Sequence, residues 1–400
     1  MNSVQLDLPV PRKLQDDLLK NLYWVDSGLE SLHFDTHDDR LLCFKYRGNT
    51  PVEDVNHRLK ETADRLARSL KVLPEKVYYS TPIRSLKGCT APYENLVRKG
   101  WVTPTSNGMH AYRGLMYDLY QALDAAFRRE ALALRVEECK LPALMDLATL
   151  ARTGYLESFP HNANLITHLP EQAEVIDRFK QAIKQNSQGA VASDGVWLAP
   201  SHALSPTVCY HFYQVHQNQT LPANLVGATA VSPCYRFEGK AMQGLRRLRE
   251  FNMREIIFLG SPDEVLVRRQ ALLELQKEML QRCHLQATIQ TASDPFFLDT
   301  YDKRRLFQMS FDLKYEVQAY LPEDDTWLAI GSVNYHQDHF GKAFGIRQAS
   351  GETAESCCLG FGIDRWCFAI FAQHGLDPDS WPETLQHLVS SVRSQGEARS

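Results

Sequence analysis

The chain has 400 residues, with 44 Lys and Arg against 48 Asp and Glu, which gives a formal net charge of −4 at pH 7. Hydrophobic residues make up 44% and charged residues 23%, usual values for a globular protein that exclude a disordered or low-complexity chain. The length favours two domains, the slight acidic excess argues against a general nucleic-acid binder, and no apolar run approaches the ~18–20 residues that cross a bilayer.

The cysteines and the N-terminus predict the compartment. Nine cysteines are dispersed along the chain without a CxxC pair, and the first residues lack a basic stretch followed by an apolar one. Without a secretory signal, such cysteines are expected to be reduced thiols. We therefore expect a cytoplasmic protein.

Residues 1–105 predict a small α/β domain of unknown role. Residues 32–34 and 41–46 are strand-like, and Thr50-Pro51-Val52-Glu53 is typical of a capping box with proline at the first helical position. The helix that follows has one apolar face and ends before a further short strand at Val77-Tyr78-Tyr79. The polar stretch Thr103–Gly108 is the expected domain boundary.

Residues 110–390 predict a second, larger domain. An amphipathic helix over 115–131 leads into an extended segment and Pro142, and residues 170–187 predict an exposed, charged helix. Strands dominate from residue 195 onward, apart from helices over 262–283 and 364–373. Strands grouped together with helices apart predict the α+β class, with an antiparallel sheet flanked by helices.

The most informative segment predicts two strands joined by a basic loop, over residues 233–260. Alternation along a strand places Arg236 and Glu238 on one face, where they can grip a phosphate and an adenine amine, or simply pair as ions. Glu255 falls on an otherwise apolar face of the second strand. An unpaired buried charge costs several kcal/mol, so Glu255 requires a metal or an arginine as its partner.

A second segment, Cys358–Arg365, is glycine-rich and opens into an apolar helix. Its glycines allow close backbone approach, and Arg365 at the helix start can meet a phosphate. The alternative is a plain joint between a strand and a helix with a surface arginine.

Together these segments resemble motifs 2 and 3 of the class II aminoacyl-tRNA synthetases, and residues 115–142 resemble motif 1, the dimerisation element. The three motifs occur in the required order. Residues 327–338 are similar to the segment that precedes motif 3 in the seryl-tRNA synthetase branch. One departure is Ala329, where that branch usually has a glutamate that helps hold ATP and its magnesium.

A closer resemblance is to the amino acid:[carrier protein] ligases, truncated homologues of atypical seryl-tRNA synthetases. It covers roughly residues 110–375 and is carried by residues 153–160, 204–210 and 251–255. That family binds a catalytic zinc, and its ligands carry over to Cys209, Glu255 and Cys358. Cys357 lies on the opposite side of the strand from Cys358.

The resemblance implies the roles of the remaining site residues. Arg236 would be catalytic, at the α-phosphate of ATP, Glu238 would read adenine, and Glu255 would also face the substrate amino acid. Arg247 and Arg365 would hold the β- and γ-phosphates of an ATP that carries Mg²⁺. The further ATP-binding positions are Leu248, Ala329, Ile330, Gly331 and Ser332.

The implied reaction is activation of a small amino acid, glycine or alanine, to an aminoacyl-adenylate. The aminoacyl group then passes to the phosphopantetheine thiol of a carrier protein, and the enzyme is expected to be a homodimer that uses no tRNA. One alternative is a true seryl-tRNA synthetase-like ligase, but the N-terminal region lacks the sustained heptads of a coiled-coil arm. The other is a non-catalytic amino-acid-sensing paralogue.

Overall fold

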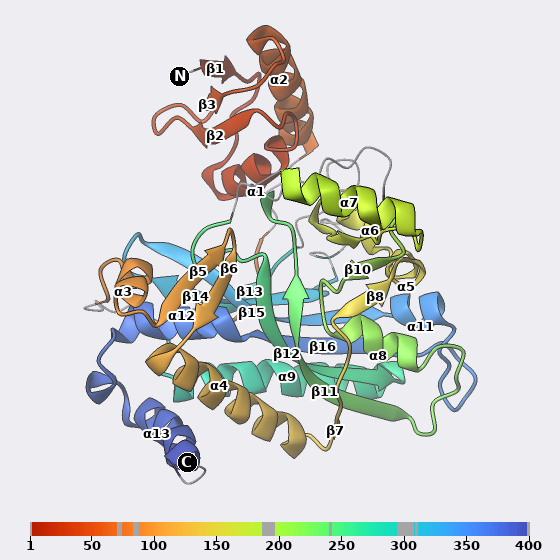
Figure 1. Cartoon of the computed structure of the whole chain (residues 1–400). Helices are drawn as coiled ribbons and strands as arrows, with labels where there is room; N and C mark the ends of the chain where they lie inside the picture. The colour runs from red at the N-terminus through yellow and green to blue at the C-terminus, as the bar shows by residue number, and fades with distance from the viewer. Residues whose placement is uncertain are drawn as a thin grey trace.

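The computed structural model describes residues 2–69, 74–82, 88–185, 197–239, 242–293, 308 and 311–397. Lys240, which belongs to the expected basic loop, lies outside this part of the chain. The N-terminal domain forms a separate lobe on a larger domain, and helix α1 is the part of that lobe nearest the larger domain (Figure 1). No helix among the described residues is long and apolar enough to cross a membrane.

The N-terminal domain is a three-stranded antiparallel sheet, in the order β1-β3-β2, covered by two helices. Its elements are β1 (Asn2–Gln5), α1 (Arg12–Leu22), β2 (Leu29–Phe34), β3 (Leu41–Tyr46) and α2 (Val52–Ser69). The capping-box helix and both strands lie where the sequence places them, whereas α1 was not expected. Both helices bury their apolar faces against the sheet in one core, so neither extends as an arm.

The segment after α2 belongs to the larger domain, which differs from the expected boundary at residue 105. Strand β4 (Val77–Ser80) pairs with β13 (Ala287–Thr291) at the edge of the large sheet. The polar stretch expected to be a linker is instead a hairpin of β5 (Val102–Ser106) and β6 (Met109–Tyr112). The physical division therefore falls between α2 and β4.

The large sheet has eight strands, in the order β4-β13-β14-β15-β16-β12-β11-β7. Its pairs are antiparallel, except that β7 runs parallel to β11. This confirms the α+β class with a sheet flanked by helices. The remaining strands are β7 (Glu137–Glu138), β11 (Leu225–Tyr235), β12 (Glu250–Gly260), β14 (Lys314–Leu321), β15 (Thr326–Gln337) and β16 (Glu355–Gly362).

The two faces of the sheet have separate cores. Along β12, Ile256 and Phe258 belong to one core, whereas Ile257 and Leu259 belong to the other. The larger core is covered by helices, and Phe127 stacks on Phe361 there at 3.9 Å between ring centroids. The covering helices are α3 (Pro92–Arg98), α4 (Gly114–Ala133), α9 (Pro262–Arg282), α12 (Ile363–His374) and α13 (Glu383–Glu397).

The opposite face of the sheet holds the candidate site. Short helices, among them α8 and α11, and a small sheet in the order β8-β10-β9 surround it. The elements here are β8 (Leu144–Asp146), α5 (Leu147–Arg152), α6 (Tyr155–Ser158), η1 (Pro160–Asn162), β9 (Leu165–Ile166), α7 (Ala173–Gln185), β10 (His202–Leu204), α8 (Cys209–Val215) and α11 (His339–Phe344). Helix α7 matches the charged helix expected over 170–187.

Candidate active site

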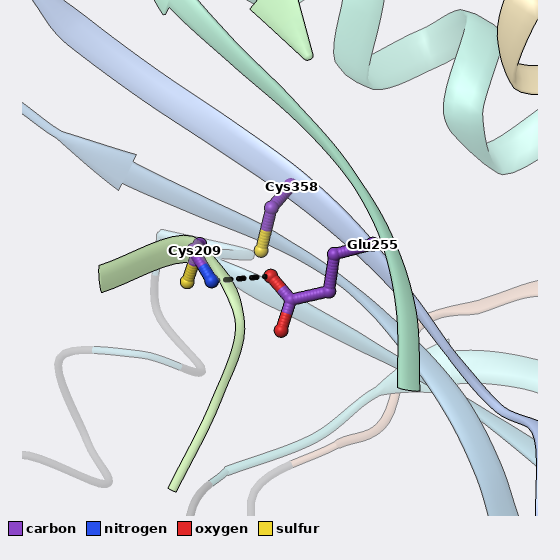
Figure 2. Close-up of side chains that lie close together, drawn as sticks. All are labelled: Cys209, Glu255 and Cys358. Atoms are coloured by element: carbon purple, nitrogen blue, oxygen red, sulfur yellow. Dashed lines mark hydrogen bonds between the residues drawn. The ribbon is translucent and has the colours of Figure 1, made fainter. Parts of the chain in front are cut away.

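Two thiols and a carboxylate converge on this face of the sheet. The ligand atoms of Cys209, Glu255 and Cys358 all lie within 4.8 Å of one another, and all three residues are buried. Glu255 and Cys358 project from the neighbouring strands β12 and β16, and Cys209 opens helix α8 above them (Figure 2). Cys357 belongs to the core on the far face of the sheet, as strand alternation requires.

The turn before α8 fixes the Glu255 carboxylate. Its Oε1 accepts hydrogen bonds from the Thr207 hydroxyl at 2.5 Å and from the Val208 amide at 3.0 Å. Its Oε2 accepts from the Cys209 amide at 3.1 Å, the bond drawn in Figure 2. These donors pair a carboxylate that the sequence left on an apolar face, and they hold it toward the two sulfur atoms.

The cluster carries shifted acidities because it is buried. Desolvation raises the pKa of Glu255 to about 7 and raises the pKa of Cys209 well above its ordinary value. A hydrogen bond from Cys209, with further contributions from His336 and Asn334, holds the pKa of Cys358 well below its ordinary value. Three negative charges would repel one another in this buried site. A divalent cation bound by the two thiolates and the carboxylate would neutralise most of that charge.

Arg236 lies beside this cluster, just beyond the end of β11 rather than inside the strand as expected. Its Nε donates to the Pro206 carbonyl at 3.1 Å, and its guanidinium lies over the Phe251 ring at 5.3 Å from the centroid. The backbone of Arg236 still continues the hairpin, through its amide and the Arg249 carbonyl at 3.0 Å. Phe251 was not singled out, although its spacing from Glu255 places it on the same face.

The basic side chains of the loop between β11 and β12 point to different partners. Arg247 donates from Nη1 to Glu238 at 2.9 Å, so the observed ion-pair partner of Glu238 is an arginine of the loop, and the pairing of Glu238 with Arg236 stays a prediction. Arg246 turns away from the site to Glu323 and Asp324. Leu248 is fully buried in the larger core, so its side chain does not face a nucleotide.

The start of α12 supplies the second arginine. Arg365 donates from Nη1 to the Ala329 carbonyl at 3.1 Å, which ties it to β15. Desolvation lowers the pKa of Arg365 to about 10, and the charges of Glu238, Arg247 and Arg236 all act on it. The structure therefore gathers these four side chains, which the sequence places in two distant motifs, around one site.

Strand β15 also carries the other expected ATP positions, Ala329 to Ser332. Ile330 is buried, and a β-carbon on Gly331 would approach the Gly360 carbonyl to 2.8 Å, so only glycine fits there. A residue that sequence reasoning missed lies opposite: Glu316 of β14 pairs in register with Ser332 and acts on the charge of Arg365. The signal that could have found it is the hairpin between the two strands.

Tyr155 is a second missed residue. Its side chain is buried between Phe159 and Tyr210, and within the described part of the chain its hydroxyl has no hydrogen-bond partner. The charges of Arg236 and Glu238 act on it. A buried hydroxyl at this place is available to a bound molecule.

The part of the chain that holds the candidate site matches a known family. Residues 199–374, which hold the cluster, the hairpin of β11 and β12 and the start of α12, match the family model "tRNA synthetase class II core domain (G, H, P, S and T)". The chain is 30% identical over 305 residues to amino acid--[acyl-carrier-protein] ligase 1 of Bradyrhizobium diazoefficiens, covering 74% of this chain and 90% of that protein.

A second relative matches more of the chain. The chain is 28% identical over 386 residues to the type-2 serine--tRNA ligase of Methanopyrus kandleri, covering 91% of this chain and 72% of that protein. Among solved structures, the M. kandleri SerRS in complex with A. aeolicus tRNASec has a TM-score of 0.72 at 23% identity, covering 97% of this chain and 77% of that one. The fold likeness therefore includes the N-terminal domain.

Proposed function

This chain belongs to the class II aminoacyl-tRNA synthetase-like ligases, and on that premise we propose that it activates a small amino acid with ATP and transfers it to a carrier protein. The observation that carries the proposal is the position of the Cys209, Glu255 and Cys358 cluster on the same face of the sheet as Arg236 and Phe251. One site thus offers an amine-binding centre beside a nucleotide-binding centre.

The cluster fits a catalytic zinc ion. Two thiolates and one carboxylate are three protein ligands, which leaves a fourth position open, as in catalytic zinc sites. Cys209, Glu255 and Cys358 would hold the ion, and the ion would bind the amine of the substrate. The carboxyl group of that amino acid would then be available to the nucleotide bound beside Arg236.

The residues around the nucleotide act by position and charge. The substrate carboxylate attacks the α-phosphorus of ATP, the bond to the β-phosphate breaks, and pyrophosphate leaves. Arg236 stabilises the charge that develops on the α-phosphate, while Arg247 and Arg365 hold the β- and γ-phosphates and Glu238 reads the adenine amine. Phe251, under the Arg236 guanidinium, gives the adenine ring an aromatic face.

In nucleotide sites, magnesium is usually bound by one or two carboxylates in addition to phosphate oxygens and water. Ala329 has none, so we assign this role to Glu316, one strand away and paired in register with Ser332. In this proposal, the backbone of residues 329–332 still contacts the bound nucleotide.

In the second step a phosphopantetheine thiolate attacks the carbonyl carbon of the adenylate. A thioester forms and AMP leaves. The identity to an amino acid--[acyl-carrier-protein] ligase over 90% of that relative supports this acceptor. The exposed helix α7, with Lys180 and Lys184, is a docking surface for an acidic carrier.

A tRNA ligase is the second candidate, and one observation favours it. The match to the type-2 serine--tRNA ligase reaches 91% of this chain, more than the three quarters that follow residue 104, so it includes part of the N-terminal domain. The charge of that domain speaks against RNA, because residues 2–69 hold 10 Lys and Arg against 12 Asp and Glu.

Pyrophosphate exchange with each of the twenty amino acids tests the first step, and we expect glycine or alanine to be active. A non-catalytic sensor would give no exchange.

The second step is tested with radiolabelled amino acid, ATP, total tRNA and a panel of phosphopantetheinylated carrier proteins. We expect label on a carrier, in a bond that hydroxylamine cleaves, and efficient charging of tRNA without carrier labelling would reverse the assignment.

We also propose that the enzyme is a homodimer through α4 and the segment to Pro142. Helix α4 keeps Tyr117 and Leu132 exposed, although its other face is buried in the core. A two-fold interface uses the same patch on both subunits. Light scattering at micromolar concentration should give a dimer, and a stable, active monomer would contradict this.

A further inference from the structure

A pocket of about 510 Å³ lies between the N-terminal domain and the loop that carries Glu238. Its volume is in the usual range for small-molecule sites. The N-terminal domain contributes Tyr23, Trp24 and Ser27 to its wall, just after the end of α1. The catalytic domain contributes Glu238 and Arg247, two of the proposed nucleotide-binding residues, so this pocket adjoins the proposed ATP site.

Trp24 makes aromatic contacts between the two domains. Its ring meets His161 edge-on at 5.1 Å between centroids and Phe237 at 6.4 Å. The side chain stays 38% exposed, because its remaining surface faces the pocket and solvent rather than a core. Trp24 belongs to the N-terminal domain but contacts the rings of His161 and Phe237 in the larger domain, so it can restrict the movement of both rings.

The two contacted rings in turn position the nucleotide-binding residues. The Phe237 amide donates to the Asn162 carbonyl at 2.9 Å, and the Arg249 guanidinium lies over the Phe237 ring at 5.1 Å from the centroid. Phe237 stands between Arg236 and Glu238 in the chain, so a displacement of its backbone would displace both of these residues. Gly239, in a left-handed conformation with φ of 57°, ends the segment, and a β-carbon placed on it would lie 3.9 Å from the Trp24 ring.

The N-terminal domain holds Trp24 from behind through Asp26. The Asp26 carboxylate accepts hydrogen bonds from the Gly28 amide at 2.9 Å, the Thr50 hydroxyl at 3.1 Å and Arg58 at 2.8 Å. These bonds fix the turn after α1 to the start of α2. Trp24 is therefore carried by a turn with little freedom to move.

We propose that the N-terminal domain completes the nucleotide site, with Trp24 as a positioning residue that holds Phe237 and His161 and thereby keeps Glu238 and Arg247 in place for ATP. This rests on the proposed function, and it gives residues 2–69 a role in the first chemical step. It requires neither a carrier protein nor an RNA.

The test compares Trp24→Ala, Trp24→Phe and Leu8→Ala in the full-length protein. Leu8 is the matched control, because it is an apolar side chain of the same domain, 41% exposed, that does not line the pocket. We expect Trp24→Ala to weaken ATP binding and raise the KM for ATP about tenfold, the effect of losing two ring contacts, while kcat changes less than threefold. Trp24→Phe should recover most of the loss, and Leu8→Ala should match the wild type.

Equilibrium binding of ATP, followed by calorimetry, separates this proposal from the proposed function. Equal ATP affinity in Trp24→Ala and wild type would overturn the role of Trp24, whether or not the enzyme activates an amino acid. A wild type that binds no ATP would overturn both. Tryptophan emission gives a second measurement, since ATP should change the emission of wild type and not that of Trp24→Phe, and an identical change in both would count against the proposal.

Discussion

Arg247 donates a hydrogen bond to Glu238 across the loop between β11 and β12, with 2.9 Å between Nη1 and Oε2. The two side chains are partly exposed and line the pocket beside the proposed nucleotide site. In the proposed function each has its own target, the phosphates for Arg247 and the adenine amine for Glu238. Binding of ATP therefore replaces this ion pair with two contacts to one ligand.

Glu238→Ala should relax the choice of purine. A carboxylate accepts a hydrogen bond from the amino group of adenine, and it repels the carbonyl oxygen that guanine has at the same position. We expect the preference for ATP over GTP in pyrophosphate exchange to fall about 10- to 100-fold. Glu323→Ala, which removes a glutamate paired with Arg246 outside the pocket, should keep the preference. An unchanged ratio in Glu238→Ala would show that another residue reads adenine.

Cys358→Ala should abolish metal binding, whereas Cys357→Ala should not. The two thiols are neighbours on β16, both buried, but Cys358 lies in the cluster and Cys357 on the far face of the sheet. Elemental analysis of purified protein should give about one zinc per chain for wild type and for Cys357→Ala. Equal zinc content in the two variants would contradict the ligand assignment.

Glu316→Gln should raise the Mg²⁺ requirement. The change removes the charge and keeps the size of the side chain, so we expect the Mg²⁺ concentration for half-maximal exchange to rise about tenfold. The electron paramagnetic resonance signal of Mn²⁺ with ATP gives the same comparison without turnover. Adding Ala329→Glu to this variant should restore metal binding, and a wild-type metal affinity in Glu316→Gln would remove Glu316 from the site.

Asp124→Ala should destabilise the fold strongly. Arg254 is 2% exposed, and its guanidinium meets both Asp124 oxygens, at 2.6 and 3.0 Å, between α4 and the strand that carries Glu255. Removing Asp124 leaves the buried Arg254 charge with the longer contact to Glu138, at 3.7 Å, so we expect a loss of about 3 kcal/mol in the free energy of unfolding, measured with urea. Asp177→Ala, which breaks an exposed pair with Lys180, should change it by less than about 0.5 kcal/mol.

His161 should make stability depend on pH. Burial lowers its pKa to about 4, below the ordinary value of 6.5, so the unfolded chain binds the proton more tightly than the native one. The free energy of unfolding should therefore fall as the pH decreases from 6.5 toward 4. In His161→Gln this part of the pH dependence should be absent. The free energy of unfolding is measured with urea at each pH, and identical pH profiles for wild type and His161→Gln would contradict the lowered pKa.

The motifs were recognisable in the sequence because each is a local pattern. The alternation around Glu255 predicted a carboxylate on an apolar face, and the structure confirms it. Parity along β16 separated Cys358 from Cys357 for the same reason. The helices α2, α4, α7 and α9 were likewise expected close to where they form.

Other features depended on contacts between distant segments. Strand β4 has the pattern of any short strand, and only its pairing with β13 assigns it to the large sheet. Helix α1 was missed, and so was Glu316, whose relation to Ser332 exists only through the pairing of β14 with β15. Arg236 and Glu238 were expected inside a strand, but β11 ends at Tyr235.

The sequence by itself therefore predicted the class of fold, because side-chain periodicity is a property of neighbouring residues. The candidate metal ligands and the proposed nucleotide-binding residues came from the resemblance of its motifs to a known family. Only the tertiary structure decided that Trp24 of the N-terminal domain meets Phe237 and His161 beside the nucleotide site. Such a meeting depends on how two separately folded cores pack, and the free energy of that packing comes from surfaces that lie more than a hundred residues apart in the chain.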